Sequence, residues 1–169
     1  MNIATTEWFA LYVKSRHEFS VETELFNKGI EVFLPAVKKH SQWKDRKKLI
    51  DYPLFPGYLF VNILPKAEEL LNVIRTRGVV TILSSGAGCP VPVSHAEINA
   101  LKLLNASSDV LDIYPQFKEG VRVRVKRGLL KGVEGIIKKK ENSLSLVINI
   151  EILGRSVGIN VLAEDLEAA

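Results

Sequence analysis

The residues best suited to chemistry form a basic stretch, KKHSQWKDRKK, which runs from Lys38 to Lys48. It holds six lysine or arginine residues against one aspartate. Lysine and arginine neutralise phosphates, and an aromatic ring such as that of Trp43 stacks on bases. We therefore expect this stretch to form the tip of a hairpin that contacts nucleic acid; a solvated loop without a ligand is the alternative. The candidate residues are Lys44, Arg46, Lys47 and Lys48.

A second stretch, PLFPGYLFV from Pro53 to Val61, concentrates aromatic rings. If its second half is a strand, Tyr58 and Phe60 share one face while Leu59 and Val61 share the other. A sheet in a small domain usually has one dry and one wet face, yet both faces of this strand are apolar. The segment WFALYVKS, residues 8–15, has the same property and includes Tyr12. An exposed aromatic patch across two such strands indicates a protein interface.

Residues for catalysis or metal binding do not assemble in this sequence. It contains no Gly-x-Ser-x-Gly, no phosphate-binding Gly-Lys-Ser/Thr loop and no His-Glu-x-x-His. His17, His40 and His95 are far apart, and the single Cys89 excludes an internal disulfide and a multi-cysteine zinc site. We predict a non-enzyme with no catalytic residues, no metal and no cofactor.

The elements that must position these residues alternate up to about residue 105. Strands are expected at 8–15, 30–35, 57–63 and 78–83, helices at 16–29, 65–76 and 94–105, and the tip and return of a long hairpin at 41–53. Gly29 suits a helix C-terminus, and Ser94 with Glu97 forms a capping-box pattern. Strands mixed with helices predict an α+β layer in which the helices pack on the sheet.

The texture of the sequence changes at Ala106. The segment ASSDVLDIYPQF is polar, lacks a helical period and contains Pro115, which predicts a linker over residues 106–117. The segments that follow, VRVRVK, GVEGIIKKK, LSLVINIEIL and SVGINVL, read as short strands separated by glycine or Asn-Ser turns. Such strands predict a small closed barrel. We therefore expect two domains, residues 1–105 and 118–169.

The composition is that of a globular protein, and its mildly basic charge is compatible with a nucleic-acid partner but is not sufficient evidence of one. The chain has 169 residues, a net charge of +4 and a pI of about 9.2, and 47% of its residues are hydrophobic. The N-terminus lacks the basic region of a signal peptide, and no window approaches the roughly 18 apolar residues of a membrane span. We expect a cytoplasmic protein, monomeric and without a membrane partner.

The segment KEGVRVRVKRGLLKGVEGIIKKK resembles the KOW motif of transcription elongation factors and ribosomal proteins. Glycines at these offsets also suit the turns of any small barrel, so a purely structural role is the alternative. The residues that carry the resemblance are Val123, Val125, Gly128, Gly132, Gly135 and Ile136.

The segments WFALYV, GIEVFLP, PLFPGYLFV and RTRGVV, in this order before a KOW unit, resemble the N-terminal domain of NusG-type transcription factors. The resemblance covers nearly the whole chain. It implies an antiparallel sheet with flanking helices (the NGN domain, ferredoxin-like), joined by a linker to an SH3-like β-barrel. The details QWKDRKK and ILGRSVGINVLAEDLE are most similar to the UpxY type of specialised paralog, which is associated with capsule and exopolysaccharide operons.

This resemblance implies an elongation and antitermination factor that suppresses pausing and termination. In the family, an apolar patch on one face of the sheet docks on the clamp helices of RNA polymerase. The residues implied to bind polymerase are Tyr12, Phe55, Pro56, Tyr58 and Phe60. Some specialised paralogs also touch the gate loop of the polymerase through a threonine-rich motif at the start of the second helix, where this chain reads EELL, residues 68–71.

Further partners are implied by the same resemblance. Lys14 and Arg16 match positions that are often basic in the family, and Arg75 and Arg77 are candidates for the same surface. These residues are implied to contact non-template DNA or nascent RNA. The barrel is implied to recruit a termination factor or a ribosomal protein.

Two alternatives concern the aromatic face of the sheet. The first is that another helix or the barrel covers this face. The second is that the face belongs to a stand-alone RNA-binding module, which stacks bases on its aromatic rings. The second alternative ranks lower, because the strand places Leu, Val and Ile where such a module interleaves glycines and basic residues. Salt separates the two functions, since phosphate binding weakens steeply with salt and apolar docking does not.

Overall fold

The computed structural model describes residues 3–43, 46–86, 88–107, 109–116 and 120–169, and it describes side chains outside residues 41–47. The chain forms two compact units, residues 1–94 and 95–169. This division comes earlier than the boundary expected after residue 105. Each unit is described separately below.

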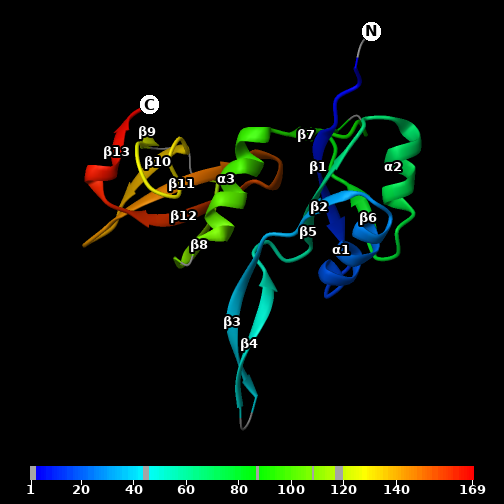
Figure 1. The fold of residues 1–169 in the computed structure, drawn as a ribbon, viewed down its shortest axis with the longest axis horizontal. Coiled ribbons are helices and arrows are strands. Elements are labelled where there is room, and N and C mark those ends of the chain that lie inside the picture. Colours follow the sequence, from blue (N-terminus) through cyan, green and yellow to red (C-terminus); the bar gives the residue numbers. More distant parts are fainter. Residues whose placement is uncertain (1–2, 44–45, 87, 108, 117–119) are drawn as a thin grey trace. The chain divides into compact units, whose positions relative to one another are not determined.

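The N-terminal unit is built on an antiparallel sheet (Figure 1). Its strands follow the order β2-β5-β1-β6, and the short β7 also pairs with β1. The strand bounds are β1 Glu7–Val13, β2 Glu31–Phe33, β5 Tyr58–Ile63, β6 Val79–Ile82 and β7 Pro92–Val93. The register of β1 and β5 places Tyr12 opposite Tyr58, as the alternation predicted.

Two helices cover one face of this sheet and close its core. They are α1, Glu18–Asn27, and α2, Ala67–Ile74. The alternating residues Phe9, Leu11 and Val13 of β1 share the core with apolar residues of β5 and of both helices. The core includes Val21, Leu25, Leu59, Val61 and Val73. The predicted helices and the predicted strands of this unit are therefore confirmed.

A long hairpin leaves the sheet between β2 and β5. Its strands are β3, Ala36–Trp43, and β4, Arg46–Pro53, which pair in register along their whole length as a separate two-stranded sheet. Figure 1 shows that the hairpin extends away from the sheet of its own unit. Its base is closed by the amide of Leu54, which donates to the carbonyl of Pro35 at 2.8 Å.

The C-terminal unit combines one helix with a six-stranded antiparallel sheet. The strand order is β13-β9-β10-β11-β12-β8. The bounds are α3 His95–Ala106, β8 Leu111–Pro115, β9 Val121–Val125, β10 Glu134–Lys139, β11 Leu144–Ile150, β12 Arg155–Val161 and β13 Leu166–Ala168. Two short 3₁₀ turns, Glu151–Leu153 and Ala163–Asp165, connect the last strands. The four strands predicted after residue 118 are confirmed as β9 to β12.

The segment predicted as a linker, residues 106–117, is partly a strand in the structure. Its middle forms β8, which pairs with β12 through the register Leu111↔Ile159 to Arg155↔Pro115. Asp112 forms an ion pair with Lys140 at 2.5 Å, and the ammonium of Lys138 lies 4.0 Å from the ring of Tyr114. β8 is a short edge strand that ends in a proline and lies within a largely polar segment, so its sequence reads as a loop.

The described part of the chain lacks both a helix able to span a membrane and a cluster of metal-binding side chains. No helix within the described ranges is both long and apolar enough to cross a membrane. The same ranges hold no group of three His, Cys, Asp or Glu side chains placed to bind a metal ion.

Candidate functional site: an aromatic and basic surface

Two tyrosines form the exposed end of the N-terminal sheet. Tyr12 of β1 and Tyr58 of β5 are cross-strand neighbours whose ring centroids lie 5.4 Å apart, with the planes tilted by 45°. Tyr12 is 41% exposed and Tyr58 is half-buried. An exposed aromatic pair held by two hydrogen-bonded strands offers a rigid contact area with little entropy to lose on binding.

The turn before β5 fixes the position of Tyr58. The amide of Tyr58 donates to the carbonyl of Phe55 at 3.0 Å, which closes a turn with Pro56 and Gly57 at its centre. Proline followed by a residue with positive φ is the signature of a type II turn, and Gly57 has φ +87°. A Cβ at this position would lie 3.2 Å from Cε2 of Tyr12. Glycine is therefore required both by the turn and by the close approach of the Tyr12 ring.

A buried carboxylate anchors the same turn. Glu18, in the first turn of α1, is only 6% exposed, and its Oε1 accepts the Gly57 amide at 2.9 Å. The carbonyl of Gly57 in turn accepts the Val13 amide at 2.9 Å. Both backbone groups of Gly57 are thus paired, one with α1 and one with the end of β1. This arrangement couples the turn both to α1 and to β1, the strand that carries Tyr12.

Two of the predicted aromatic contacts are not on the surface. Phe55 and Phe60 are 2% and 0% exposed, and the ring of Phe60 stacks on Phe33 at 6.2 Å. Trp8 and Ala10, which share the Tyr12 face of β1, are buried as well. The expectation of an exposed patch is therefore wrong for Phe55 and Phe60, because this part of the face is covered.

The remaining surface of that face is small. Of the five residues implied to bind polymerase, Pro56 and Tyr12 are exposed, and Tyr58 is half-buried. Stacking of bases across the sheet requires accessible rings on neighbouring strands. The buried ring of Phe60 argues against that alternative.

Basic residues gather beside the tyrosine pair. The amide of Lys14, directly after β1, donates to the carbonyl of Gly78 at 2.8 Å, which brings Arg77 next to Lys14 along the backbone. Arg16 lies in the turn closed by the His17 amide on the Lys14 carbonyl and has φ 64°. Lys14, Arg16 and Arg77 are all exposed, so three of the four predicted basic residues come together. The fourth, Arg75, is also exposed and ends α2.

Arg16 stands in a conformation that side chains other than glycine seldom adopt. A non-glycine residue in the left-handed region costs on the order of 1 kcal/mol. The turn holds this conformation between β1 and α1 and places the guanidinium-bearing residue at the tip. Such strain occurs more often at functional positions than elsewhere.

The hairpin candidates are only partly described. Lys48 of β4 is exposed. Arg46 and Lys47 belong to β4, and the structure describes their main chain but not their side chains. Lys44 lies outside the described residues. The prediction that these three residues contact nucleic acid stays a prediction.

The residues that resemble the KOW motif pack in the interior or form turns of the C-terminal unit. Val123 and Val125 are buried, and Ile136 is half-buried. Gly128 and Gly132 have φ of +86° and +89° in the β9–β10 turn. A Cβ on Gly135 would lie 2.6 Å from the carbonyl oxygen of Val147, so the two strands could not approach as they do.

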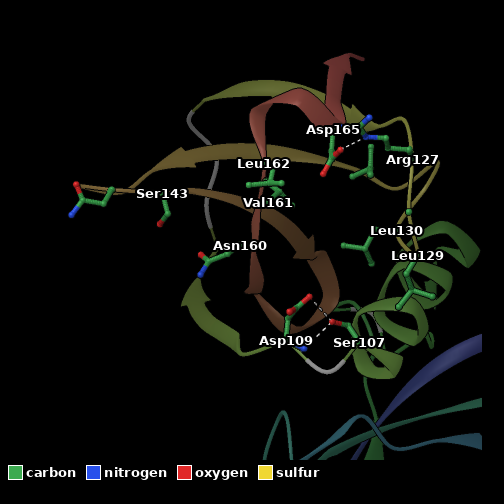
Figure 2. A pocket seen from close by; sticks show the side chains of 13 residues that line it. Ser107, Asp109, Arg127, Leu129, Leu130, Ser143, Asn160, Val161, Leu162 and Asp165 are labelled. Carbon is green, nitrogen blue, oxygen red and sulfur yellow. Dashed lines mark hydrogen bonds and ion pairs between the residues drawn. The ribbon is translucent and has the colours of Figure 1, made fainter.

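A pocket of about 390 Å³ opens on the C-terminal unit (Figure 2). Its apolar wall includes Leu130 of the β9–β10 turn, and Val161 and Leu162 at the end of β12. Figure 2 shows the polar pairs Ser107–Asp109 and Arg127–Asp165 on its rim. Leu129 and Leu162 are exposed, which gives the pocket a partly apolar mouth.

The sequence reasoning missed Glu18 and the pocket leucines. A glutamate in the first turn of a helix is common because its negative charge interacts favourably with the helix dipole. Its presence in the sequence therefore does not indicate that it also binds a distant turn. The Pro-Gly dipeptide did signal the turn itself. Leu129 and Leu130 lie between the glycines of the KOW segment, where an apolar pair in a turn is a detectable signal.

Comparisons with known proteins agree with this architecture. The family model described as "Transcription termination factor nusG" matches residues 6–102. The chain is similar to proteins named "Transcription termination/antitermination protein NusG" from Borreliella burgdorferi and Staphylococcus aureus. Each is 25% identical, over 95% and 98% of this chain respectively and 97% of the relative.

A solved structure shows the same fold. The structure titled "Domain interaction in Thermotoga maritima NusG" has a TM-score of 0.56 and 24% identity, and the match covers 96% of both chains. This likeness and the antiparallel sheets of the present chain support the predicted N-terminal domain with a C-terminal sheet domain. Because the matching family model spans more than half of the sequence, the chain belongs to the NusG family.

Proposed function

We propose that this protein is a non-enzymatic transcription factor that binds elongating RNA polymerase through the Tyr12–Tyr58 pair. The observation that carries the proposal is the rigid mounting of the pair, with Gly57 paired to both Glu18 and Val13. Membership of the NusG family and the printed names of its relatives support a role in transcription. Such a factor would act in the cytoplasm beside the polymerase.

The docking contact is Tyr12, Pro56 and Tyr58, and it faces the clamp helices of the polymerase. Aromatic anchors on a preorganised surface carry much of the binding energy in protein interfaces. Phe55 and Phe60 act from the interior, since both support the strand and turn that hold the exposed residues. A factor that binds the closed clamp better than the open clamp shifts the population toward the closed, forward-moving state.

Nucleic acid is the second partner in this proposal. Lys14, Arg16 and Arg77 form a basic group at the same end of β1 as Tyr12 and contact non-template DNA or nascent RNA. Arg75 and the basic hairpin extend the same electrostatic contact. These contacts strengthen binding at low salt, whereas the tyrosine contact depends little on salt.

The C-terminal unit recruits a further protein in this proposal, either a termination factor or a ribosomal protein. The pocket between the β9–β10 turn and the end of β12 supports this part, because it is lined by exposed leucines within a polar rim. We further propose that the factor acts as an antiterminator at selected operons, such as those for polysaccharide synthesis. The resemblance of QWKDRKK and ILGRSVGINVLAEDLE to the UpxY type motivates this last step.

The test is a calorimetric titration of a clamp-helix fragment of RNA polymerase into the full-length protein at two salt concentrations. We expect the Tyr12→Ala/Tyr58→Ala variant to lose binding by about 30-fold, in line with the loss of a central aromatic contact. Tyr52→Ala is the matched control, because Tyr52 on the hairpin is as exposed as Tyr12. The control should bind within about twofold of the wild type.

Two results would contradict the proposal. One is wild-type binding that disappears at high salt, which would make the contact electrostatic. The other is an equal loss in the Tyr52→Ala control, which would place the contact elsewhere on the unit. Separate titration with single-stranded RNA distinguishes the docking factor from a stand-alone RNA-binding module.

A further inference from the structure

The β3–β4 hairpin has two chemically different faces. Residues directly opposite each other in an antiparallel pair lie on the same face. The pairs Val37↔Tyr52, Lys39↔Ile50 and Ser41↔Lys48 therefore share one face of the hairpin, named here the cationic face. The pairs Lys38↔Asp51 and His40↔Leu49 share the other, named here the paired face.

Charge is balanced on only one of these faces. On the paired face, the ammonium of Lys38 lies 3.1 Å from the carboxylate of Asp51. The cationic face carries Lys39 and Lys48 and, among the hairpin residues whose side chains the structure describes, no carboxylate. Its lysines are exposed and available to an anionic partner.

The aromatic ring on the cationic face is already covered by a cation. The ammonium of Lys39 lies 4.5 Å from the centroid of the Tyr52 ring. A base that stacked on this side of the ring would have to displace that ammonium. Ile50 and Tyr52 remain exposed at their edges, so the face combines apolar edges with positive charge.

We propose that the cationic face of the β3–β4 hairpin inserts into the major groove of double-stranded DNA. The major groove, about 12 Å wide, admits a two-stranded ribbon whose strands lie about 4.8 Å apart. Strands of eight residues give a ribbon about 27 Å long, enough to follow the groove. Lys39 and Lys48 reach phosphates or guanine edges, and Ile50 meets thymine methyl groups.

This inference rests on the proposed role of the hairpin in binding nucleic acid, but it does not depend on the tyrosine contact. It also selects among nucleic acids. The major groove of A-form RNA is too narrow and deep for side chains to read, and a single strand offers no groove. Duplex DNA should therefore bind more tightly than duplex RNA or single-stranded DNA of the same sequence.

The test is fluorescence anisotropy of the full-length protein with a fluorescein-labelled DNA duplex of about 20 base pairs, at about 50 and 200 mM salt. The variants Lys39→Gln and Lys48→Gln remove one charge each from the cationic face. Lys38→Gln is the matched control, because it removes the same charge from the neighbouring residue on the paired face. Duplex RNA and single-stranded DNA serve as comparison probes.

We expect the double variant Lys39→Gln/Lys48→Gln to weaken duplex DNA binding about tenfold and to lower the salt slope by nearly 2, about 0.9 per phosphate contact. Lys38→Gln should change the affinity by less than about twofold, because that charge is already paired. A urea unfolding midpoint equal to that of the wild type, followed by tryptophan fluorescence, shows that the N-terminal unit of the double variant is intact.

Three outcomes would overturn the inference. They are an equal loss in Lys38→Gln, equal affinity for duplex RNA or single-stranded DNA, and no wild-type binding to duplex DNA at low salt. The assay contains no polymerase, so its result does not depend on whether the tyrosine pair binds polymerase. The Tyr12→Ala/Tyr58→Ala variant should bind duplex DNA as the wild type does.

Discussion

Replacement of Glu18 tests whether a buried carboxylate holds the turn that presents Tyr58. The bond from the Gly57 amide to Glu18 Oε1 is 2.9 Å long, and both partners are buried. A hydrogen bond to a charged acceptor stabilises a protein by about 1.5–3 kcal/mol, and its loss leaves a buried amide unpaired. We therefore expect Glu18→Ala to lower the free energy of unfolding of the N-terminal unit by about 2–3 kcal/mol.

Glu18→Gln separates the bond from the charge. Glutamine keeps an oxygen that accepts the Gly57 amide, so we expect a loss of about 1 kcal/mol or less. Glu24→Ala is the matched control, because it makes the same change in the same helix at a half-buried position. It should alter the unfolding free energy by no more than about 0.5 kcal/mol.

The assay is urea unfolding followed by tryptophan fluorescence. Both tryptophans, Trp8 and Trp43, belong to the N-terminal unit, so the signal reports on that unit alone. Equal losses in Glu18→Ala and Glu24→Ala would refute the reasoning, as would a loss in Glu18→Gln as large as that in Glu18→Ala. Clamp-fragment affinity should fall with Glu18→Ala and be largely retained with Glu18→Gln, because the turn rather than the charge positions Tyr58.

Three further predictions concern packing and pH. Gly135→Ala should destabilise the C-terminal unit by about 2 kcal/mol or more in thermal unfolding, because its Cβ would lie 2.6 Å from the Val147 carbonyl. Gly128→Ala meets no neighbour and should cost only its backbone strain at φ +86°, on the order of 1 kcal/mol. The hydrogen bond from Lys140 holds the pKa of Asp112 below its ordinary value of 3.8, so its stabilisation is present above that value and is lost as the pH falls through the lowered pKa. Asp112→Asn should therefore lower the protection of β8 amides from hydrogen exchange at pH 7 by at most about 1 kcal/mol, as expected for a largely exposed pair. The difference between variant and wild type should shrink as the pH falls through that lowered pKa. Burial, and secondly the charge of Asp51, raise the pKa of Glu22, so the ionised side chain destabilises the folded protein once the pH rises through that pKa. Glu22→Gln should therefore raise the free energy of unfolding by up to about 0.5 kcal/mol at pH 7 and leave it unchanged near pH 4, as measured by urea unfolding.

Local patterns in the sequence were enough to predict most elements. Alternation predicted β1 and β5 with Tyr12 and Tyr58 on one face, and helical spacing predicted α1 to α3. The short strands β7, β8 and β13 were not predicted, because a period of two cannot be recognised reliably in only two to five residues. Their pairing depends on neighbours that are distant in sequence.

The candidate site was predictable in its residue types but not in its exposure. A strand that is apolar on both faces does not reveal which rings are covered, so Phe60 and Phe55 were expected on the surface and lie inside. The bond between Glu18 and Gly57 joins residues 39 positions apart and has no local signature. The positive φ of Arg16 likewise follows from the turn between β1 and α1.

The hairpin and the tyrosine pair share one anchored segment. The hairpin ends at Pro53, the Leu54 amide closes its base on Pro35, and the turn that holds Tyr58 begins at Phe55. Leu54 and Phe55 are both buried, so this short connection is fixed in the interior. In the proposed complex, docking of the tyrosines therefore also fixes the base of the hairpin. A weak contact of Lys39 and Lys48 with DNA then becomes an intramolecular step with a high effective concentration, which explains how two modest surfaces can act as one binding site.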